Sequence, residues 1–594
     1  MTSPTPLRLW PGIVAVVLQG LARFGIKAVV PGIKGFGRGM MVSFVFTIAL
    51  IVWWAFFSRA SRKERFGALG LIAVALGATW LFRHESMWLP WLLAYAIPFL
   101  SLAFVIWAVA TRRLPDRVRH ATLVATILIA CGAWLFVRQN GINGDHQAEF
   151  GWRWSKSSEE LLLAETANEP AQPAAPVAAP SITTAAATAS PSPSASPEAS
   201  KNSAAPAPAA ETRAEWPGFR GARRDGTVRG VRIDADWTTK PPVQMWHRPV
   251  GPAWSSFAVR GDLFYTQEQR GDNEVVACYK AATGEPVWTH RDAARFFESN
   301  AGAGPRATPT LSNNRVYTFG ATGILNALEA SNGAVVWTRN VSSDTNTKVP
   351  FWGFSSSPLL IGDLVIVAAS GQLVAYEAAT GNRRWLGPNP GGSYSSPQLV
   401  TIDGVQQVLL VTGAGATSVT PTDGKQLWEH AWASNSIVQP AVTPEGDVLI
   451  TSQESGTRRI AVAHNASGWS AQERWTSNGL KPYFNDFVVH KGYAYGFDGR
   501  ILACIDLKDG ERKWKGGRYG NGQLVLLPDQ DLLLVLSEEG ELVLVGATPD
   551  QFTERAKVPA LQGKTWNHPV LVGDILLVRN AEEMAAYRLP LAQK

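Results

Sequence analysis

Four long stretches of apolar residues dominate the first quarter of the chain. Each holds about 17–23 residues without a charged side chain, and a helix needs about 20 such residues to cross a membrane. The stretches are Met40–Phe57, Phe66–Phe82, Trp88–Ala110 and Ala121–Val137. A fifth, Leu9–Val30, is interrupted by Arg23 and Lys27, and it fits either another span or an amphipathic helix in the membrane interface. The pattern predicts a transmembrane bundle of four or five helices.

The charged residues between these stretches orient the bundle. Residues 58–65 (SRASRKER) and 111–120 (TRRLPDRVRH) are strongly basic, as loops on the cytoplasmic side of a membrane tend to be. The turn at 83–87 and the exit after Val137 are not basic, so we expect them on the other side. The chain is therefore predicted to leave the membrane on its outer face.

The pattern changes twice after the bundle. Residues 138–167 are mixed in character, with a short helix expected at 157–166, and Asn168–Ala210 consists mostly of Ala, Pro, Ser and Thr. Such a composition cannot bury a core, so we expect a disordered tether there. The predicted domains are an anchor (1–137), a juxtamembrane segment with its linker (138–212) and a β-rich domain (213–594).

An internal repeat fills the C-terminal part of the chain. A Gly, three residues and a Trp recur at Gly284–Trp288, Gly333–Trp337, Gly381–Trp385, Gly424–Trp428 and Gly510–Trp514. Trp475 occupies the same place in a degenerate copy, and Trp246 opens the series. Successive tryptophans are about 39–49 residues apart, which is the length of one four-stranded propeller blade.

The number of copies predicts an all-β propeller with eight blades. Seven repeats run from Leu263 to about Val558, and an eighth, beginning near His568, ends without its outer strand. The segment Pro242–Val250 supplies an outer strand with no blade before it. We therefore expect this N-terminal strand to complete the last blade, because closing the ring removes the exposed sheet edges.

Six positions before each repeat glycine the side chain is always small. The column contains Cys278, Ala327, Ala375, Ser418 and Cys504. A tightly packed position between blades would impose this restriction. Because Cys278 and Cys504 take equivalent places in different blades, we expect them to stay apart as buried thiols. With Cys131, the chain has three cysteines and no Cys-x-x-Cys pair, which argues against a zinc ribbon or a c-type haem site.

Charge is distributed unevenly along the chain. The net charge is +7, but the first 137 residues contribute about +11, so the rest sums to about −4. The basic character therefore belongs to the predicted membrane part, where it sets topology. It gives no reason to expect a nucleic-acid partner.

The combination of a small residue, five residues, Gly, three residues and Trp resembles the tryptophan-docking motif of the PQQ-binding-like propeller family. That family includes quinoprotein dehydrogenases and the outer-membrane assembly lipoprotein of the β-barrel machinery. The opening Trp216–Gly226 (WPGFRGARRDG) is similar to the start of many bacterial proteins with such propellers. The multi-span anchor resembles that of membrane-bound quinoprotein glucose dehydrogenases, whereas the compact blades look more like the assembly lipoprotein.

The loops before the innermost strands should line the mouth of the central funnel, where ligands commonly bind. The first such loop, 296–306, carries Glu298, Asn300 and Arg306. Glu298 and Asn300 offer the oxygen ligands that calcium prefers. Arg306 is suited to pair with a carboxylate.

Two further loops carry candidate chemistry. In residues 481–486, Asn485 is a candidate cofactor contact and Asp486 a candidate general base or metal ligand. In residues 564–568, Trp566 is suited to stack on a flat cofactor, Asn567 to contact it and His568 to shuttle protons. Polar residues at such positions also commonly satisfy turn backbones, so a structural role is the alternative for each loop.

Two functions fit the anchor, the repeat and these loops. The first is a propeller tethered to the bacterial inner (cytoplasmic) membrane, exposed to the periplasm, that binds a protein partner as a scaffold or envelope-assembly module. The alternative is an oxidoreductase that uses pyrroloquinoline quinone and calcium to pass electrons from an alcohol or sugar to membrane quinone. The family resemblance covers about 375 residues and specifies the fold more strongly than the activity.

Overall fold

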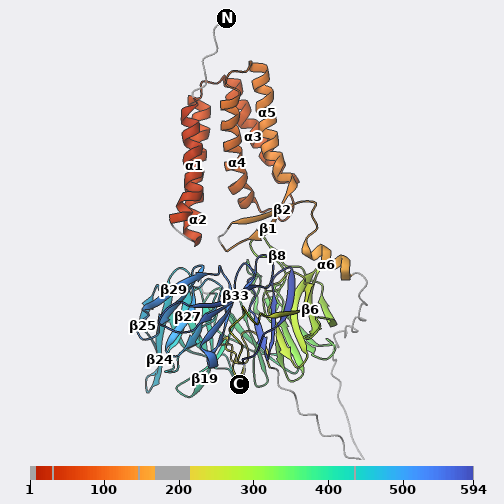
Figure 1. The fold of residues 1–594 in the computed structure, drawn as a ribbon, viewed down its shortest axis with the longest axis vertical. Coiled ribbons are helices and arrows are strands. Elements are labelled where there is room, and N and C mark those ends of the chain that lie inside the picture. Colours follow the sequence, from red (N-terminus) through yellow and green to blue (C-terminus); the bar gives the residue numbers. More distant parts are fainter. Residues whose placement is uncertain (1–8, 30–31, 145–146, 167–214, 434–436, 593–594) are drawn as a thin grey trace, which may run out of the picture.

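Figure 1 shows a bundle of helices standing on one face of a ring of small β-sheets. In this computed structural model the described residues are 9–29, 32–144, 147–166, 215–433 and 437–592. The predicted linker lies outside the described residues, so the expectation for it stays a prediction.

Apolar helices make up the described part of the bundle. They are α1 (Trp10–Val29), α2 (Gly32–Val52), α3 (Arg62–Phe82), α4 (Leu89–Ala110) and α5 (Asp116–Gly132). A π-helical turn, η1 (Trp53–Phe57), prolongs α2, and a 3-10 turn, η2 (Ala133–Phe136), prolongs α5. Among the described residues, α2 to α5 with these extensions are the four helices long and apolar enough to cross a membrane. All four firm stretches predicted from the sequence are therefore helical, and the fifth, α1, is a helix with a shorter apolar part at Trp10–Ile26.

Close side-chain contacts hold the bundle together. Helices α1 and α2 pack antiparallel, with Gly12 against the ring of Trp53 and the Gln19 amide donating to Thr47 Oγ1 at 2.7 Å. At the end remote from the ring, the Arg119 guanidinium on α5 donates to both carboxylate oxygens of Glu64 on α3, at 3.0 and 2.6 Å. The two basic loops predicted to be cytoplasmic adjoin this ion pair, so they lie at the end of the bundle away from the propeller (Figure 1).

Two short elements lie between the bundle and the ring (Figure 1). Strands β1 (Val137–Ile142) and β2 (Ala148–Trp152) form an antiparallel hairpin directly after α5. Helix α6 (Ser158–Thr166) follows and confirms the short helix expected at 157–166.

The ring consists of eight four-stranded antiparallel sheets, as predicted. Blades 1 to 4 contain β4 (Ala258–Arg260), β5 (Leu263–Arg270), β6 (Asn273–Lys280) and β7 (Pro286–Asp292); β10 (Thr310–Ser312), β11 (Arg315–Phe319), β12 (Ile324–Glu329) and β13 (Val335–Asn340); β14 (Leu359–Ile361), β15 (Leu364–Ala369), β16 (Gln372–Glu377) and β17 (Arg383–Leu386); and β18 (Gln398–Ile402), β19 (Val405–Thr412), β20 (Gly415–Val419) and β21 (Gln426–Ala431).

Blades 5 to 8 contain β22 (Ala441–Val442), β23 (Val448–Ser452), β24 (Gly456–Asn465) and β25 (Gly468–Ser477); β26 (Val488–His490), β27 (Tyr493–Asp498), β28 (Ile501–Asp506) and β29 (Arg512–Arg518); β30 (Gln523–Leu527), β31 (Leu532–Leu536), β32 (Glu541–Gly546) and β33 (Glu554–Pro559); and β34 (Val570–Val572), β35 (Ile575–Arg579), β36 (Glu583–Arg588) and β3 (Val243–Pro249). Short elements interrupt the connections: β8 (Phe297–Glu298) and β9 (Gly302–Ala303), α7 (Val341–Thr345) and η3 (Pro528–Gln530).

The repeat of Gly and Trp reflects how neighbouring blades touch. Trp337 donates its indole N–H to the carbonyl of Ala378 in the next blade at 2.9 Å, and its ring lies over Gly381, where a Cβ would come within 2.7 Å. The same two contacts join Trp246 to blade 1 at Gly284, Trp288 to Gly333, Trp385 to Gly424 and Trp475 to Gly510. A side chain at these glycines would collide with the ring, so each tryptophan requires a glycine one blade later.

The small-residue column has an equally direct cause. Each of its members pairs with the tryptophan of its own blade across the two outer strands: Cys278 with Trp288, Ala327 with Trp337, Ala375 with Trp385, Ser418 with Trp428 and Cys504 with Trp514. All five small residues are fully buried. The three cysteines are buried and free, as expected.

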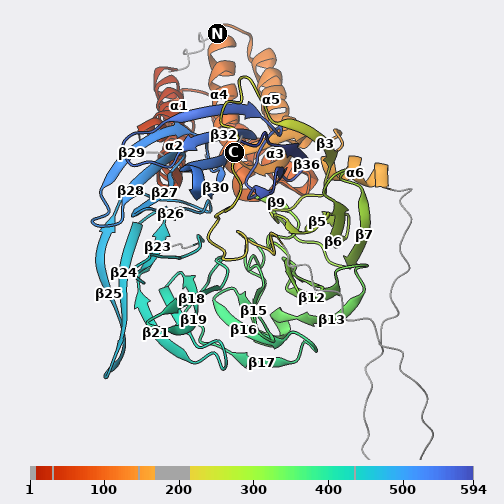
Figure 2. The ribbon, with the colours of Figure 1, turned by 60° about the horizontal axis from the view of Figure 1, so that its bottom comes forward.

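The N-terminal strand of the ring closes it, as the sequence predicts. Strand β3 pairs antiparallel with β36, with Trp246 opposite Ala586. The largest apolar core cluster lies around this joint, because β3 and blades 7, 8 and 1 all contribute to it. Figure 2 shows the closed ring from the face opposite the bundle.

Candidate functional site

The central channel of the ring has two different openings. The innermost strands start at the face that bears the bundle and end at the opposite face, as β10 does: loop 296–306, which precedes it, is bonded to the β1–β2 hairpin. We call the opening bounded by loops 296–306 and 562–568 the bundle-side mouth. The opening bounded by Arg260, Asn313–Asn314 and Thr443 is the far mouth.

The chain covers its own bundle-side mouth with the β1–β2 hairpin. The backbone N–H of Ile142 donates to the carbonyl of Asn300 at 2.6 Å, and the Gln139 amide donates to the carbonyl of Ser299 at 2.8 Å. On the other side of the mouth, Lys564 Nζ donates to the carbonyl of Ile142 at 2.9 Å. Strands that follow the apolar helices therefore bind directly to the loops predicted to hold a ligand.

The bundle and α6 add contacts to the same face. The indole N–H of Trp91, on α4, donates to Oδ1 of Asn300 at 3.2 Å. Glu159, on α6, pairs with Arg295 at 2.8 Å and accepts a hydrogen bond from the N–H of Gly271, also at 2.8 Å. Sequence reasoning treated residues 138–167 as a lead-in to the tether, because periodicity carries no signal for a docked hairpin.

Glu298 and Arg306 stabilise the 296–306 loop from within. The Glu298 carboxylate accepts the backbone N–H groups of Asn300 and Ala301 at 2.7 and 2.6 Å, and Arg306 lies 3.3 Å from it. Burial raises the pKa of Glu298 more than these partners lower it. Burial also lowers the pKa of Arg306 to about 10. The Arg306 guanidinium also donates hydrogen bonds to the carbonyls of Gly302, Ala303, Gly304 and Trp352.

The 564–568 loop contacts its neighbours in a similar way. Trp566 donates to Glu538 at 3.1 Å and lies between the rings of Trp254 and Phe484. The Asn567 amide donates to the carbonyls of Ala253 and Ser255 at 3.2 and 2.8 Å. Asn485, fully buried, accepts the N–H of Tyr483 at 2.9 Å.

Asp486 and His568, which come from two of the predicted loops, meet inside the ring. Asp486 Oδ2 lies 3.1 Å from His568 Nε2 and 3.6 Å from Arg220 Nε. Burial alone would raise the pKa of Asp486, but the charge of Arg220 and the hydrogen bond from His568 outweigh it and hold that pKa below its usual value. Burial lowers the pKa of His568 more than Asp486 raises it.

Arg220 belongs to a segment that sequence reasoning did not place in the channel. Residues 216–228, hereafter the plug, cross the channel on its far side (Figure 2). Arg220 also donates to the carbonyl of Phe487 at 2.6 Å, and the fully buried Arg224 donates to the carbonyls of Ser357, Pro358 and Pro397. The density of arginines in Trp216–Gly226 was the available signal, since buried arginines require carbonyl or carboxylate partners.

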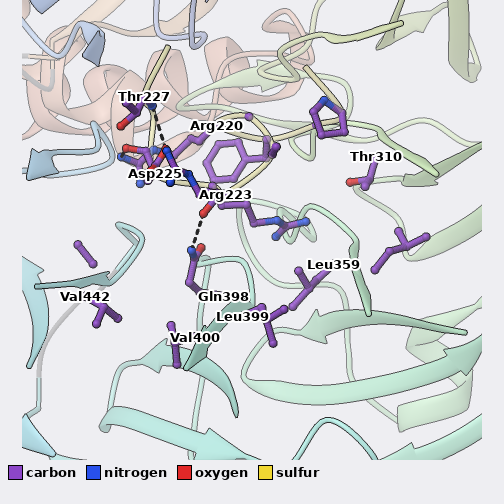
Figure 3. Close-up of a pocket in the computed structure, with 18 of the residues that line it drawn as sticks. Arg220, Arg223, Asp225, Thr227, Thr310, Leu359, Gln398, Leu399, Val400 and Val442 are labelled. Carbon is purple, nitrogen blue, oxygen red and sulfur yellow. Dashed lines mark hydrogen bonds and ion pairs between the residues drawn. The ribbon is translucent and has the colours of Figure 1, made fainter. Parts of the chain in front are cut away.

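A cavity of about 1200 Å³ lies between the plug and the innermost strands of blades 2 to 6, and it opens at the far mouth. Figure 3 shows Arg223 and Asp225 of the plug facing Leu359, Leu399, Val400 and Val442 of the strands. The Gln398 amide donates to the carbonyl of Arg223 at 3.0 Å, and Gln398 Oε1 is buried without a partner in the described part of the chain.

The predicted ligands fall into two clusters that share no hydrogen bond or ion pair among the described residues. Asn300 and Glu298 lie at the bundle-side mouth, whereas Asp486 lies inside the channel. Calcium takes six to eight oxygen ligands, and the carboxylates available here already bind arginine or backbone N–H groups. Nor do the described residues contain a group of three or more His, Cys, Asp or Glu side chains suited to a metal. The donor set does not fit a calcium–quinone pair in this arrangement, and ligand binding at these residues stays a prediction.

Comparison with known proteins supports the family resemblance that the repeat indicates. Residues 244–516 match the family model described as outer membrane protein assembly factor BamB. BamB of Shewanella oneidensis is 25% identical over 335 residues, covering 52% of this chain and 79% of its own. BamB of Burkholderia pseudomallei is 26% identical over 185 residues, covering 30% and 45%. The propeller belongs to the PQQ-repeat-like family.

Two solved structures are similar to part of this chain at low identity. BamB from Moraxella catarrhalis has a TM-score of 0.43 at 14% identity, covering 59% of this chain and 99% of its own. Quinohemoprotein alcohol dehydrogenase from Comamonas testosteroni has a TM-score of 0.47 at 13% identity, covering 64% and 81%. These likenesses concern the fold alone.

Proposed function

We propose that this chain is an inner-membrane protein whose PQQ-repeat propeller faces the periplasm and binds a protein partner as a scaffold in envelope assembly. The apolar helices supply the membrane anchor, and the sequence relatives are named as outer membrane assembly factors. The basic loops at the end of the bundle remote from the propeller support this orientation, because positive loops stay in the cytoplasm.

One observation carries the proposal. The bundle-side mouth, where a quinoprotein-like funnel would receive cofactor and substrate, is filled by the β1–β2 hairpin and the groups that bind it. The surfaces left open are the far mouth and the outer strands. A binding module uses such surfaces, whereas an enzyme acting through the bundle-side mouth would need the hairpin to leave.

Cysteine labelling tests the membrane orientation. The native thiols are buried, and burial raises the pKa of Cys278 and of Cys504 to about 12, so an added surface cysteine reacts selectively. In intact spheroplasts, Lys508→Cys on the propeller should react with a membrane-impermeant maleimide. Arg113→Cys, in the loop after α4, should react only after permeabilisation. The reverse pattern would exclude a periplasmic propeller.

A cofactor titration tests the scaffold role against the dehydrogenase alternative. The full chain in detergent is mixed with pyrroloquinoline quinone and calcium, and then with a panel of alcohols and sugars and an artificial electron acceptor. We expect neither a bound-quinone absorbance at micromolar concentration nor substrate-dependent dye reduction. Dye reduction that disappears in Asp486→Asn would establish the enzyme instead.

A further inference from the structure

We propose that the far mouth binds an extended, acidic polypeptide segment of a partner protein by adding it to the free inner edges of blades 3 to 6. The inference rests on the proposed scaffold role and names the chemistry of its partner. The plug already makes backbone hydrogen bonds to the inner edges of three of the eight blades, so the chain itself shows that these edges accept added backbone.

The plug pairs with the inner edges of blades 1, 2 and 7. Trp216 and Val259 exchange two backbone hydrogen bonds, at 3.2 and 2.7 Å. The N–H of Leu311 donates to the carbonyl of Pro217 at 2.7 Å. In blade 7, Leu526 donates to the carbonyl of Gly226 and accepts from the N–H of Val228, both at 2.8 Å. The plug, whose middle consists of turns, thus forms single β-bridges with two of the sheets and one further backbone hydrogen bond with a third.

Strand register explains why Val259 and Leu311 are the residues used. Each stands one position before the residue that closes a two-residue turn. Arg260, after Val259, pairs with Leu263, and Ser312, after Leu311, pairs with Arg315. The closing pair exchanges its hydrogen bonds within the blade, so the N–H and C=O of the preceding residue point away from it. On an innermost strand, that direction is the channel.

The same position is open in blades 3 to 6. Its occupants are Leu360, Thr401 and Val489, and in blade 5 Val442, which precedes a longer turn closed by the Thr443 N–H and the Asp447 carbonyl. All four line the cavity, and none is buried. In the part of the chain that the structure describes, their backbone groups make no hydrogen bond to another element. Unpaired strand edges of this kind are templates for an added strand.

Charge selects an acidic segment. The cavity lining contains five arginines and one aspartate: Arg220, Arg223, Arg224, Arg229, Arg260 and Asp225. Arg220 and Arg224 bind groups of the blades. Arg223 lies 3.5 Å from Asp225 of the plug but keeps its side chain 60% exposed, and Arg229 is exposed at the rim. The propeller, residues 213–594, has a net charge of about zero, so this mouth is a local positive region on a neutral domain. Arginines bind carboxylates through paired hydrogen bonds.

The cavity size suits a polymer. Its volume of about 1200 Å³ exceeds the roughly 300–1,000 Å³ that drug-sized ligands occupy. Leu359, Leu399 and Val400 give the wall apolar patches between the open backbone groups (Figure 3). An extended peptide also alternates polar backbone groups with side chains along its length, so its backbone and its apolar side chains can both find partners on this wall.

Peptide binding to the full chain in lipid nanodiscs tests the inference. The probe is a fluorescent ten-residue peptide of alternating Val and Thr with two C-terminal Glu residues. We expect saturable binding by fluorescence anisotropy. A version with two Lys in place of the Glu residues, and a version with N-methylated alternate amides, should each bind at least tenfold more weakly. Equal binding of the N-methylated peptide would overturn the strand-addition mode.

Matched variants locate the site. Arg223→Gln with Arg229→Gln should weaken the acidic peptide about tenfold, whereas Arg291→Gln, an exposed arginine on outer strand β7, should leave binding unchanged. Val442→Pro should weaken both charged peptides alike, because proline removes the N–H and distorts the edge. Its thermal unfolding, compared with that of the unsubstituted chain, separates lost binding from lost folding.

The remaining outcomes are decisive as well. An oligogalacturonate that binds as tightly as the acidic peptide and competes with it would show a polyanion site and overturn the polypeptide assignment. No binding of any probe, with the propeller correctly oriented in the labelling experiment, would overturn this inference and leave the membrane-anchored scaffold standing. A propeller labelled on the cytoplasmic side would contradict the proposed function, whatever the result of the peptide-binding experiment.

Discussion

At the scale of single residues, the repeated motif is a chain of contacts between blades. Trp246, Trp288, Trp337, Trp385 and Trp475 each send the indole N–H to a carbonyl of the following blade and cover that blade's glycine. The spacing of the glycines and tryptophans along the sequence was enough to reveal the repeat. The column of small residues indicated that neighbouring blades pack tightly. Two exceptions show what spacing misses. Trp428 donates to Gln407 Oε1, a side chain of its own blade, at 2.7 Å. Trp514 donates to the carbonyl of Thr548 in the next blade but covers no described glycine there.

Removing one of these contacts should destabilise the ring measurably. Trp337→Ala deletes a side chain that is 8% exposed together with its hydrogen bond, and such truncations cost about 3–5 kcal/mol. Val335→Ala, two residues earlier on the same strand and 40% exposed, should cost less than about 1 kcal/mol. Urea unfolding followed by intrinsic fluorescence measures both. Similar midpoints for the two variants would contradict the docking role.

Glu274 gives the ring a pH-dependent contact between blades 1 and 2. It accepts the N–H of Ala321 at 2.9 Å and the hydroxyl of Thr322 at 3.2 Å, and burial raises its pKa to about 7. Because this folded-state pKa lies above the unfolded value of about 4.5, protonation of Glu274 favours the folded state. The stabilisation is fully present below about pH 4.5. This stability is lost as the pH rises through 7.

The wild-type chain should therefore lose stability between pH 5 and pH 8, and Glu274→Gln should lose less. We expect the melting temperature of the variant, relative to wild type, to rise across this interval by a few degrees. Glu511→Gln, whose side chain is 71% exposed, should show no such trend. A difference between Glu274→Gln and wild type that stays constant with pH would refute the assignment.

At the scale of elements, two segments outside the blades decide what the channel can do. The β1–β2 hairpin occupies one mouth and the plug narrows the other. Neither placement was predictable from periodicity, because each segment is held where it lies by partners far along the chain. The three funnel loops were correctly located by the repeat, but the partners of their polar groups were not.

The plug should contribute strongly to stability through Arg220. Its guanidinium is 3% exposed and neutralises the buried Asp486, so Arg220→Ala leaves an unpaired charge and should cost about 3–5 kcal/mol. Arg223→Ala, three residues later and 60% exposed, should change stability by no more than about 0.5 kcal/mol. Adding Asp486→Asn to Arg220→Ala should recover part of the loss in chemical unfolding. An additive double variant would show that the pair is not coupled.

At the scale of the whole molecule, sequence periodicity predicted the helices, the eight blades and the closure at β3. It did not predict that the propeller sits against the bundle, since a chain with a long linker fits a freely tethered domain equally well. Contacts of Trp91, Gln139, Lys564 and Glu159 create that junction. The propeller is therefore held with its far mouth directed away from the bundle (Figure 1).

Cleavage of the linker tests this arrangement most directly. A specific protease site is inserted between residues 167 and 214, and the cut chain is passed over a sizing column in detergent. Co-elution of the bundle and the propeller is expected, because the hairpin and α6 hold them together. Gln139→Ala combined with Lys564→Ala and Glu159→Ala should release the propeller. Separation of the two parts in the otherwise unsubstituted chain would contradict the closed bundle-side mouth, on which the proposed binding role depends.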